Sequence, residues 1–214
     1  MHVVITGANR GIGAALAQAY TGRGDTVTGT SRDPEAAHTL DVTDPASHRA
    51  FAARLDGKPV DLLVCNAGVY LDKGQTLPDG YPVKMWADSF AANVTGVFLT
   101  VQTLLPCLQA AKSGKIAIIS SQMASHERAP GGSYIYRASK AAALNLGRNL
   151  AADLAPLGLS VGIYHPGWVR TDMGGDGADI SVDEAAAGLI DRFDALGPDS
   201  TGCFKTWDGQ DHPY

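Results

Sequence analysis

The sequence predicts a single α/β domain, residues 1–214, built on a doubly wound parallel sheet of about seven strands. Short apolar runs alternate along the chain with longer amphipathic or alanine-rich segments, which is the rhythm of repeated β-α-β units. A composition of 45% hydrophobic and 18% charged residues suits one buried core. No internal repeat and no linker rich in proline, glycine or serine divides the chain.

The strands are predicted where apolar runs are bounded by polar or glycine-containing turns. In chain order they cover residues 3–5, 26–30, 39–41, 61–65, 115–120, 160–164 and 202–206. The third of them is very short. Only residues 33–40 lie between Arg32 and Asp41, whereas a parallel crossover needs about a dozen residues or more. We therefore predict that the helix between the second and third strands is missing.

The helices are predicted from amphipathic or alanine-rich segments that end at proline or glycine. They cover residues 13–22, 45–55, 81–111, 133–155 and 182–196. Asp44 precedes the proline that opens the second helix and is a predicted N-cap. Ser181, with Glu184 three residues later, predicts a capping box for the last helix.

Composition excludes several classes of function. The net charge of -5 and the scattered basic residues argue against nucleic acid and anionic membrane surfaces as partners. The three cysteines are far apart and form no CxxC pair, so we expect neither a disulfide framework nor a metal site. No secretory leader is recognisable at the N-terminus. A cytoplasmic location is therefore expected.

A glycine-rich turn follows the first strand and opens the first helix. Small residues there let the backbone approach a pyrophosphate at the positive end of the helix. The spacing G-x3-G-x-G and its strand-turn-helix context predict a dinucleotide site. Its predicted contacts are Gly7, Asn9, Arg10, Gly11, Ile12 and Gly13.

The end of the second strand bears on cofactor choice. A protein that prefers NAD(H) usually carries a carboxylate here for the ribose hydroxyls, but this chain has Ser31 followed by Arg32. Arg32 and Arg10 together offer two guanidinium groups for a 2′-phosphate. NADP(H) is therefore predicted in preference to NAD(H), whose use stays open. Solvated surface arginines are the alternative interpretation.

Two further strand ends point to the same ligand. Asp41 closes the third strand and Val42 follows it, and the Asp41 carboxylate can accept a hydrogen bond from the adenine amino group. Asn66, Ala67 and Gly68 end the fourth strand at the carboxyl edge of the sheet, where open α/β folds bind ligands. A simple turn explains the Asn-x-Gly sequence equally well.

Tyr136 and Lys140 lie one helical turn apart in a segment of strongly helical composition, so they share one face. A phenol with a pKa of about 10 is a poor base near neutral pH unless an ammonium favours the phenolate. We therefore expect Lys140 to lower the pKa of Tyr136, which then transfers a proton to or from a substrate oxygen. Tyr134 has Ala138 at the corresponding position and is excluded.

Three other positions are candidates from their context. Ser120 and Ser121 end a strand, and a hydroxyl there can hydrogen-bond a substrate oxygen as charge develops on it. Asn93 lies among small apolar residues of a helix and either binds water or backbone near Lys140 or kinks the helix. A proline- and glycine-containing turn after the sixth strand offers groups for the nicotinamide carboxamide, namely Pro166, Gly167, Val169 and Thr171.

In this combination and order, the chain resembles the short-chain dehydrogenase/reductase family over nearly its whole length. The resemblance rests on residues 6–13, Asp41, 66–68, Asn93, Ser121, Tyr136 with Lys140, and 166–167. It implies a Rossmann-type domain with a seven-stranded sheet and a catalytic tetrad of Asn93, Ser121, Tyr136 and Lys140, in which the lysine also binds the nicotinamide ribose. Residues 136–141 and 165–175 are similar to the C-factor and sniffer-like carbonyl reductases, which are NADPH-linked.

The resemblance implies hydride transfer between NADP(H) and a ketone, an aldehyde or a secondary alcohol, with a small molecule as substrate and a homodimer or homotetramer as the assembly. A dinucleotide-sensing or signalling protein with vestigial catalysis is the alternative. A sugar-nucleotide epimerase would use the same Tyr/Lys pair, but it usually carries an added C-terminal substrate domain. The short loop after Thr171 predicts a shallow, accessible substrate pocket.

Overall fold

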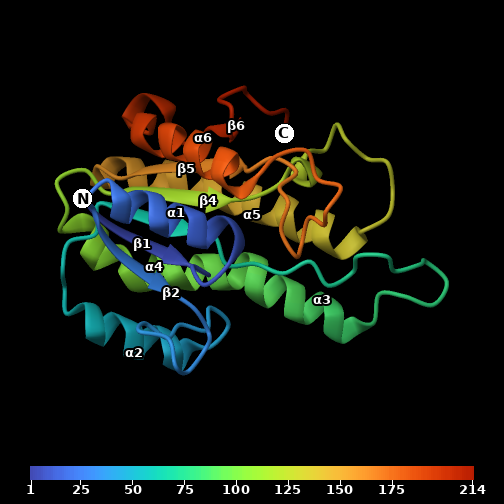
Figure 1. Ribbon diagram of the computed structural model, residues 1–214, viewed down its shortest axis with the longest axis horizontal. Helices are drawn as coiled ribbons and strands as arrows, with labels where there is room; N and C mark the ends of the chain where they lie inside the picture. The colour runs from blue at the N-terminus through green and yellow to red at the C-terminus, as the bar shows by residue number, and fades with distance from the viewer.

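The computed structural model describes residues 1–214 and contains one parallel sheet of six strands (Figure 1). The order across the sheet is β2-β1-β3-β4-β5-β6, and every neighbouring pair is parallel. The strands are β1 (His2–Thr6), β2 (Thr26–Thr30), β3 (Leu62–Cys65), β4 (Lys115–Ile119), β5 (Ser160–His165) and β6 (Phe204–Thr206). The predicted fold class is confirmed.

Helices cover both faces of the sheet (Figure 1). One face carries α1 (Gly11–Gly22) and α6 (Val182–Ala195), and the other carries α2 (Pro45–Leu55), α4 (Gly96–Gln109) and α5 (Tyr134–Leu154). The predicted helix caps form as expected. Asp44 accepts hydrogen bonds from the first turn of α2, and Ser181 makes a capping box with Glu184.

Alternate strand residues enter the two cores, because successive side chains of a strand point to opposite faces. Val4, Leu63 and Ile118 join the core beneath α2, α4 and α5, whereas Ile5 and Val64 join the core beneath α1 and α6. All of these side chains are fully buried. Because both faces of the sheet are buried, the strands consist of nearly continuous apolar residues in the sequence.

The segment between β2 and α2 contains no helix, as predicted. The third predicted strand, at residues 39–41, is reduced to a single parallel bridge between Ser31 and Thr39. The Leu40 amide donates to the Ser31 carbonyl at 2.8 Å, which closes the segment as a tight loop. Too few residues lie between β2 and Thr39 to form a helical crossover, so β2 is the edge strand of the sheet.

One long helical run extends from α3 (Val83–Phe90) through a π-helical turn (Ala91–Thr95) into α4. It covers most of the helix predicted at residues 81–111, but the π turn interrupts the regular α-helix around Asn93. The run Val83–Gln109 is long and apolar enough to cross a membrane by length and composition alone. Half of its apolar stretch is buried inside the protein, where α4 contributes to the core.

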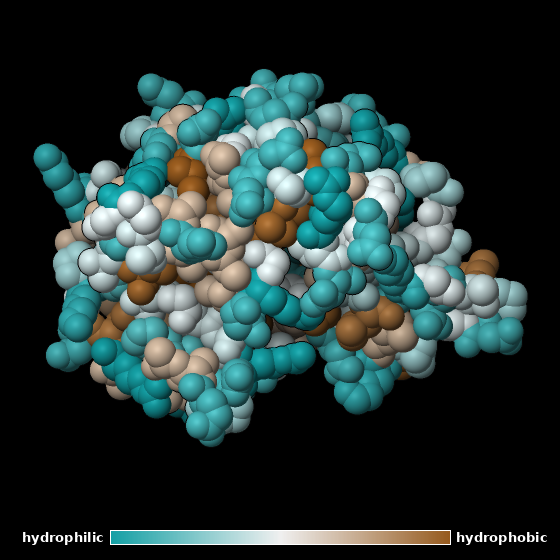
Figure 2. Space-filling view, in the orientation of Figure 1, coloured by the Kyte–Doolittle hydropathy of each residue, from teal (hydrophilic) through white to brown (hydrophobic).

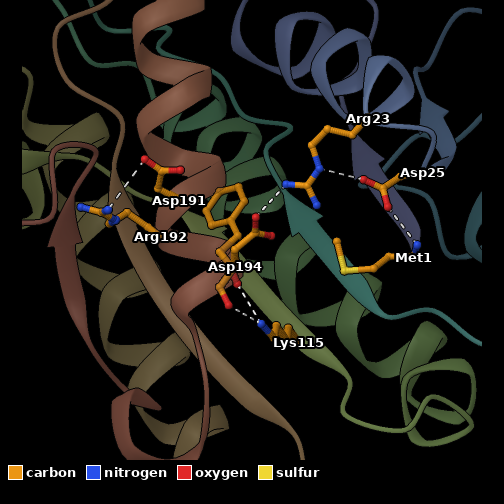
Figure 3. Close-up of polar contacts among 8 residues, drawn as sticks. Met1, Arg23, Asp25, Lys115, Asp191, Arg192 and Asp194 are labelled. Atoms are coloured by element: carbon orange, nitrogen blue, oxygen red, sulfur yellow. Dashed lines mark hydrogen bonds and ion pairs between the residues drawn. The ribbon is translucent and has the colours of Figure 1, made fainter.

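Ion pairs join several elements at the amino ends of the strands (Figure 3). The Arg23 guanidinium, just after α1, bonds Asp25 at 3.1 Å and Asp194 of α6 at 2.7 Å. The Met1 ammonium also pairs with Asp25, and Lys115 at the start of β4 donates to the Asp194 carbonyl at 2.8 Å. This network holds α1 and α6 on the sheet at the edge opposite the site described next.

Candidate active site

A cleft of about 820 Å³ opens at the carboxyl ends of the strands. The face of the molecule seen in Figure 2 is mainly hydrophilic, with apolar residues exposed in small patches. The predicted site residues that line the cleft are Gly7, Asn9, Arg10, Gly11, Ile12, Ser31, Arg32, Asp41, Val42, Asn66, Ala67, Gly68, Tyr136, Lys140, Pro166 and Thr171. The other predicted site residues are not part of this lining, namely Gly13, Asn93, Ser121, Gly167 and Val169.

The glycine turn leaves room for a ligand backbone. Gly7 and Gly11 have φ angles of 67° and 55°, a conformation that only glycine adopts without strain. A Cβ atom at Gly13 would lie 2.2 Å from the Gly7 carbonyl oxygen, so this position must be glycine for α1 to start here. The turn therefore forms a cradle of backbone amides at a helix N-terminus, which fits a dinucleotide pyrophosphate.

Asn66 fastens this turn to the end of β3. Its side-chain amide donates to the carbonyl oxygens of Thr6 and Gly7, at 2.9 and 3.0 Å. The Thr6 hydroxyl in turn accepts hydrogen bonds from the backbone amides of Asn66 and Ala67, both at 3.0 Å. The predicted Asn-Ala-Gly element thus holds the glycine turn rigidly at the cleft wall, in addition to lining the cleft.

The two predicted arginines have different surroundings. Arg32 is exposed and makes no ion pair or side-chain hydrogen bond, whereas Arg10 pairs with Asp172 across the mouth of the cleft at 2.5 Å. Asp172 was not identified from the sequence, because the two residues are 162 positions apart. The Ser31 side chain is buried and accepts a hydrogen bond from the Asp33 amide at 3.2 Å.

Asp41 lies on the cleft wall between these groups and the core. One of its carboxylate oxygens accepts hydrogen bonds from the amide and hydroxyl of Thr43, at 2.9 and 2.7 Å. Hydrogen bonding from Thr43 holds the pKa of the Asp41 carboxyl below its ordinary value, and Arg32 contributes in the same direction. The second oxygen makes no hydrogen bond within the protein and can accept one from an adenine amino group.

Tyr136 and Lys140 line the inner end of the cleft on the first two turns of α5. Both are buried, and the Lys140 ammonium lies 5.6 Å from the centre of the Tyr136 ring. The ammonium donates a hydrogen bond to the Ile119 carbonyl at 3.0 Å. Burial lowers the pKa of Lys140 to about 8 and raises the pKa of Tyr136 above its ordinary value. This direction for Tyr136 corrects the lowering that we expected from Lys140, because desolvation of the phenolate exceeds any attraction to the ammonium.

The two serines at the end of β4 have different partners. The Ser120 hydroxyl donates to the backbone carbonyl of Lys140 at 3.2 Å and is thereby occupied. Ser121 begins a short 3-10 turn, where its hydroxyl accepts a hydrogen bond from the Met123 amide at 3.1 Å. A hydrogen bond from Ser121 also lowers the pKa of Tyr136, in opposition to burial. Of the two hydroxyls, only that of Ser121 contributes to the pKa of Tyr136.

Asn93 is 1% exposed and lies within the π-helical turn. Its carbonyl oxygen accepts from the Val69 amide at 2.8 Å, and its amide group donates to the Val69 carbonyl and to the Ser139 hydroxyl, both at 2.9 Å. These bonds connect the loop after β3 with α5 one residue before Lys140. Both interpretations made from the sequence apply, since the helix is distorted and the amide binds backbone near Lys140.

The turn after β5 borders the cleft opposite α5. Gly167 has a φ angle of 89°, and a Cβ atom there would lie 2.5 Å from the Ile180 side chain. Val169 is buried and forms a bridge with Ile180. The Thr171 hydroxyl accepts from the Gly174 amide at 3.0 Å and donates to the Val169 carbonyl. The single donor of this hydroxyl is therefore occupied, and its second lone pair can still accept a hydrogen bond from a ligand.

Two residues that the sequence analysis missed contact the start of α5. The Tyr70 ring stacks on the Tyr136 ring with centroids 4.2 Å apart, and the Asp72 carboxylate accepts hydrogen bonds from the amides of Ile135 and Tyr136. Both follow the Asn-Ala-Gly element in a segment without periodicity. A buried aspartate is unusual, but nothing local in the sequence marks Asp72 as buried.

Comparison with known proteins identifies the family of this chain. The family model described as short chain dehydrogenase matches residues 1–179. The protein named C-signal from Myxococcus xanthus is 35% identical over 167 residues, which cover 78% of this chain and 99% of that protein.

Solved structures share the fold over the full length. The NADPH-bound carbonyl reductase from chicken fatty liver has a TM-score of 0.91 and 31% identity, and the match covers 100% of this chain and 98% of that one. The carbonyl reductase Sniffer of D. melanogaster also has a TM-score of 0.91 and covers 100% of this chain and 99% of its own. At 24% identity, this second likeness concerns the fold alone.

Proposed function

The chain belongs to the short-chain dehydrogenase family, as its motifs predicted, and we propose that it is an NADP(H)-dependent carbonyl reductase with Tyr136 as the general acid/base. One observation carries the proposal. The cleft runs without interruption from the glycine turn to the buried pair Tyr136 and Lys140, so a dinucleotide bound at one end reaches the proton donor at the other.

The cofactor preference rests on the charged groups at the outer end of the cleft. Arg10 and Arg32 line the cleft together with Ser31, which stands just after β2 where a protein that prefers NAD(H) usually carries a carboxylate. A guanidinium group matches a phosphate dianion in shape and charge. The carbonyl reductase from chicken fatty liver has NADPH bound, which supports the same preference for this chain.

The chemistry assigned to the side chains follows from their protonation states. When bound, the nicotinamide of NADPH supplies the hydride that reduces the carbonyl carbon. The raised pKa of Tyr136 keeps its phenol protonated near neutral pH, which suits proton donation to the oxygen of the forming alcohol. Ser121 hydrogen-bonds the same oxygen as negative charge develops, and the Asn93 bonds hold α5 in place.

The Lys140 ammonium has two tasks in this proposal. Its pKa of about 8 leaves it mainly charged at pH 7, so it can bind a ribose hydroxyl of the cofactor and favour release of the proton from Tyr136. Because Asn93 binds the Ser139 hydroxyl, the helix segment that carries Lys140 is fixed relative to the loop after β3.

The test is NADPH oxidation with a panel of ketones and aldehydes. We expect Tyr136→Phe to lower turnover by about 10² to 10⁴-fold, with NADPH affinity within a factor of about 2. Tyr134→Phe is the matched control, since Tyr134 is partly exposed and lies on the same helix turn. Full activity of Tyr136→Phe would refute the assignment of the proton donor.

A second candidate function is a dinucleotide-sensing or signalling protein with vestigial catalysis. The observation that favours it is the similarity to the protein named C-signal over nearly that protein's whole length. Tight NADPH binding without turnover of any carbonyl in the panel would favour this candidate over the reductase.

We also propose that residues 1–214 act as one domain in the cytoplasm and assemble as a homodimer or homotetramer. The apolar side chains exposed on α3 and α4 support the assembly, with Val83 85% and Phe98 41% exposed. Light scattering at micromolar concentration, with Val83→Glu and Phe98→Glu as disruptive variants, measures the oligomeric state.

A further inference from the structure

Asp72 is a buried carboxylate without a basic partner. Its side chain is 1% exposed, and none of the ion pairs in the structure includes it. A carboxylate removed from water is stable only where hydrogen bonds replace its hydration. The hydrogen-bond donors that replace water around the Asp72 carboxylate therefore indicate what this residue does.

These groups are the first backbone amides of α5. Ile135 donates to Asp72 at 2.8 Å, and the Tyr136 amide donates to both carboxylate oxygens, at 3.2 and 3.3 Å. The helix has no cap of its own, because Ser133 adopts a left-handed conformation with φ 47° and its side chain makes no capping bond. A residue more than 60 positions earlier in the chain thus caps the helix that carries Tyr136 and Lys140.

Tyr70, two residues before Asp72, also contacts the first turn of α5. Its ring lies 4.2 Å from that of Tyr136 at an interplanar angle of 22°, and its hydroxyl lies 2.5 Å from the Ser133 hydroxyl. One segment therefore holds both the backbone of Tyr136, through Asp72, and its ring, through Tyr70. A cap that served the helix alone would not need the second contact.

We propose that Asp72 is a positioning residue for Tyr136, which with Tyr70 fixes the phenol in the geometry for proton transfer. The inference rests on the proposed reductase function. Alignment of a proton donor within a fraction of an ångström is required for efficient transfer, and a misplacement of 1 Å can reduce the rate by about 100-fold. Asp72 binds the backbone amide of Tyr136 directly. Loss of the Asp72 carboxylate should therefore displace the phenol of Tyr136 more than it disturbs the rest of the fold.

The charge of Asp72 acts on Tyr136 as well. The groups that face the phenol are the Asp72 carboxylate and the Tyr70 ring from the loop after β3, the Ser121 hydroxyl from the end of β4, and Lys140 from α5. Asp72 and Tyr70 raise the pKa of Tyr136, whereas Ser121 lowers it. Removal of the Asp72 charge should therefore lower the pKa of Tyr136.

The deciding variant is Asp72→Asn, which keeps the size of the side chain and removes its charge. The matched control is Asp44→Asn, since Asp44 caps α2 through hydrogen bonds to the amides of Ala46 and Ser47. Three measurements are made on each full-length variant: hydrogen exchange of the Ile135 and Tyr136 amides, NADPH affinity in the absence of a carbonyl, and kcat and KM as functions of pH.

For Asp72→Asn we expect faster exchange of both amides, a decrease in kcat of about 10-fold or more, and an alkaline limb of kcat that moves to lower pH. NADPH affinity and carbonyl KM should stay within a factor of about 2. Asp44→Asn should lose comparable stability without these changes. Asp72→Asn would overturn the proposal if its kcat and pH profile matched those of the control.

Tyr70→Leu gives a second test that leaves the helix cap intact. It removes the ring stacked on Tyr136, and we expect kcat to fall while the Ile135 and Tyr136 amides keep their protection. Unchanged kcat in this variant would also count against the proposal. Failure of the proposed reductase function is distinguishable from failure of this positioning role, because a protein that is not a reductase would reduce no carbonyl with NADPH even as the wild type.

Discussion

The Lys140 ammonium lies 5.6 Å from the Tyr136 ring and donates its hydrogen bond to the Ile119 carbonyl, so the pair is close but not directly bonded. Both side chains are buried, and burial disfavours the charged form of each. The lysine is therefore kept at a cost to stability, which is a common property of functional sites.

Replacement of Lys140 by methionine should stabilise the cofactor-free protein. The pKa of Lys140 falls from 10.5 in water to about 8 in the fold, so the charged lysine costs about 3 kcal/mol below pH 8. We expect a net gain of about 1 to 3 kcal/mol at pH 7, since the Ile119 carbonyl loses its donor.

The gain should depend on pH in a defined direction. Between pH 8 and 10.5 the unfolded chain binds more protons at Lys140 than the folded chain, so wild-type stability rises with pH and the advantage of Lys140→Met shrinks. Urea unfolding at pH 7 and pH 10 measures the difference, with the exposed Lys112→Met as control. A Lys140→Met protein less stable than wild type at pH 7 would contradict the predicted cost of the buried charge.

The two serines after β4 should separate activity from stability. Ser121→Ala removes the hydroxyl that lowers the pKa of the Tyr136 phenol, and we expect turnover to fall by about 10² to 10³-fold. Ser120→Ala removes the 3.2 Å bond to the Lys140 carbonyl and should cost about 1 kcal/mol of unfolding free energy, with a much smaller effect on turnover. Steady-state kinetics and thermal unfolding of both variants test this, and the reverse pattern would exchange their roles.

Arg32 should discriminate between the two nicotinamide cofactors. It is exposed at the cleft wall and has no ion pair within the protein, so it is available to a 2′-phosphate. We expect Arg32→Ala to weaken NADPH binding by roughly 10-fold, or about 1.4 kcal/mol, and to leave NADH binding unchanged. Fluorescence titration with both cofactors gives the ratio, and equal losses for the two would refute the phosphate contact.

Asp172 should oppose the same interaction. It pairs with Arg10 across the mouth of the cleft, so a cofactor phosphate must compete with its carboxylate for the guanidinium. Asp172→Asn should tighten NADPH binding by a few-fold and leave NADH binding unchanged. The pair is largely exposed, with side chains 69% and 78% accessible, so little stability is lost. Weaker NADPH binding in this variant would mean that the pair closes over the cofactor and assists its binding.

More of the fold than of the site could be predicted from the sequence. Strand and helix positions followed from local periodicity, and the missing helix followed from the short span between Arg32 and Asp41. The glycine turn and the Tyr136 and Lys140 pair were also visible, because each is defined by spacing within one element. The third predicted strand, at residues 39–41, was overestimated, since pairing of the short segment at Thr39 depends on how β2 ends.

By itself, the sequence determined which residues can carry the chemistry, because residue type and local spacing set their hydrogen-bonding capacity and the helix face they share. The tertiary structure alone decided which groups act on one another. It brought Asp72 to the amides of α5, paired Arg10 with Asp172, and buried Tyr136 so that its pKa rises. Desolvation and charge interactions depend on distances between segments far apart in the chain, and packing of those segments sets these distances.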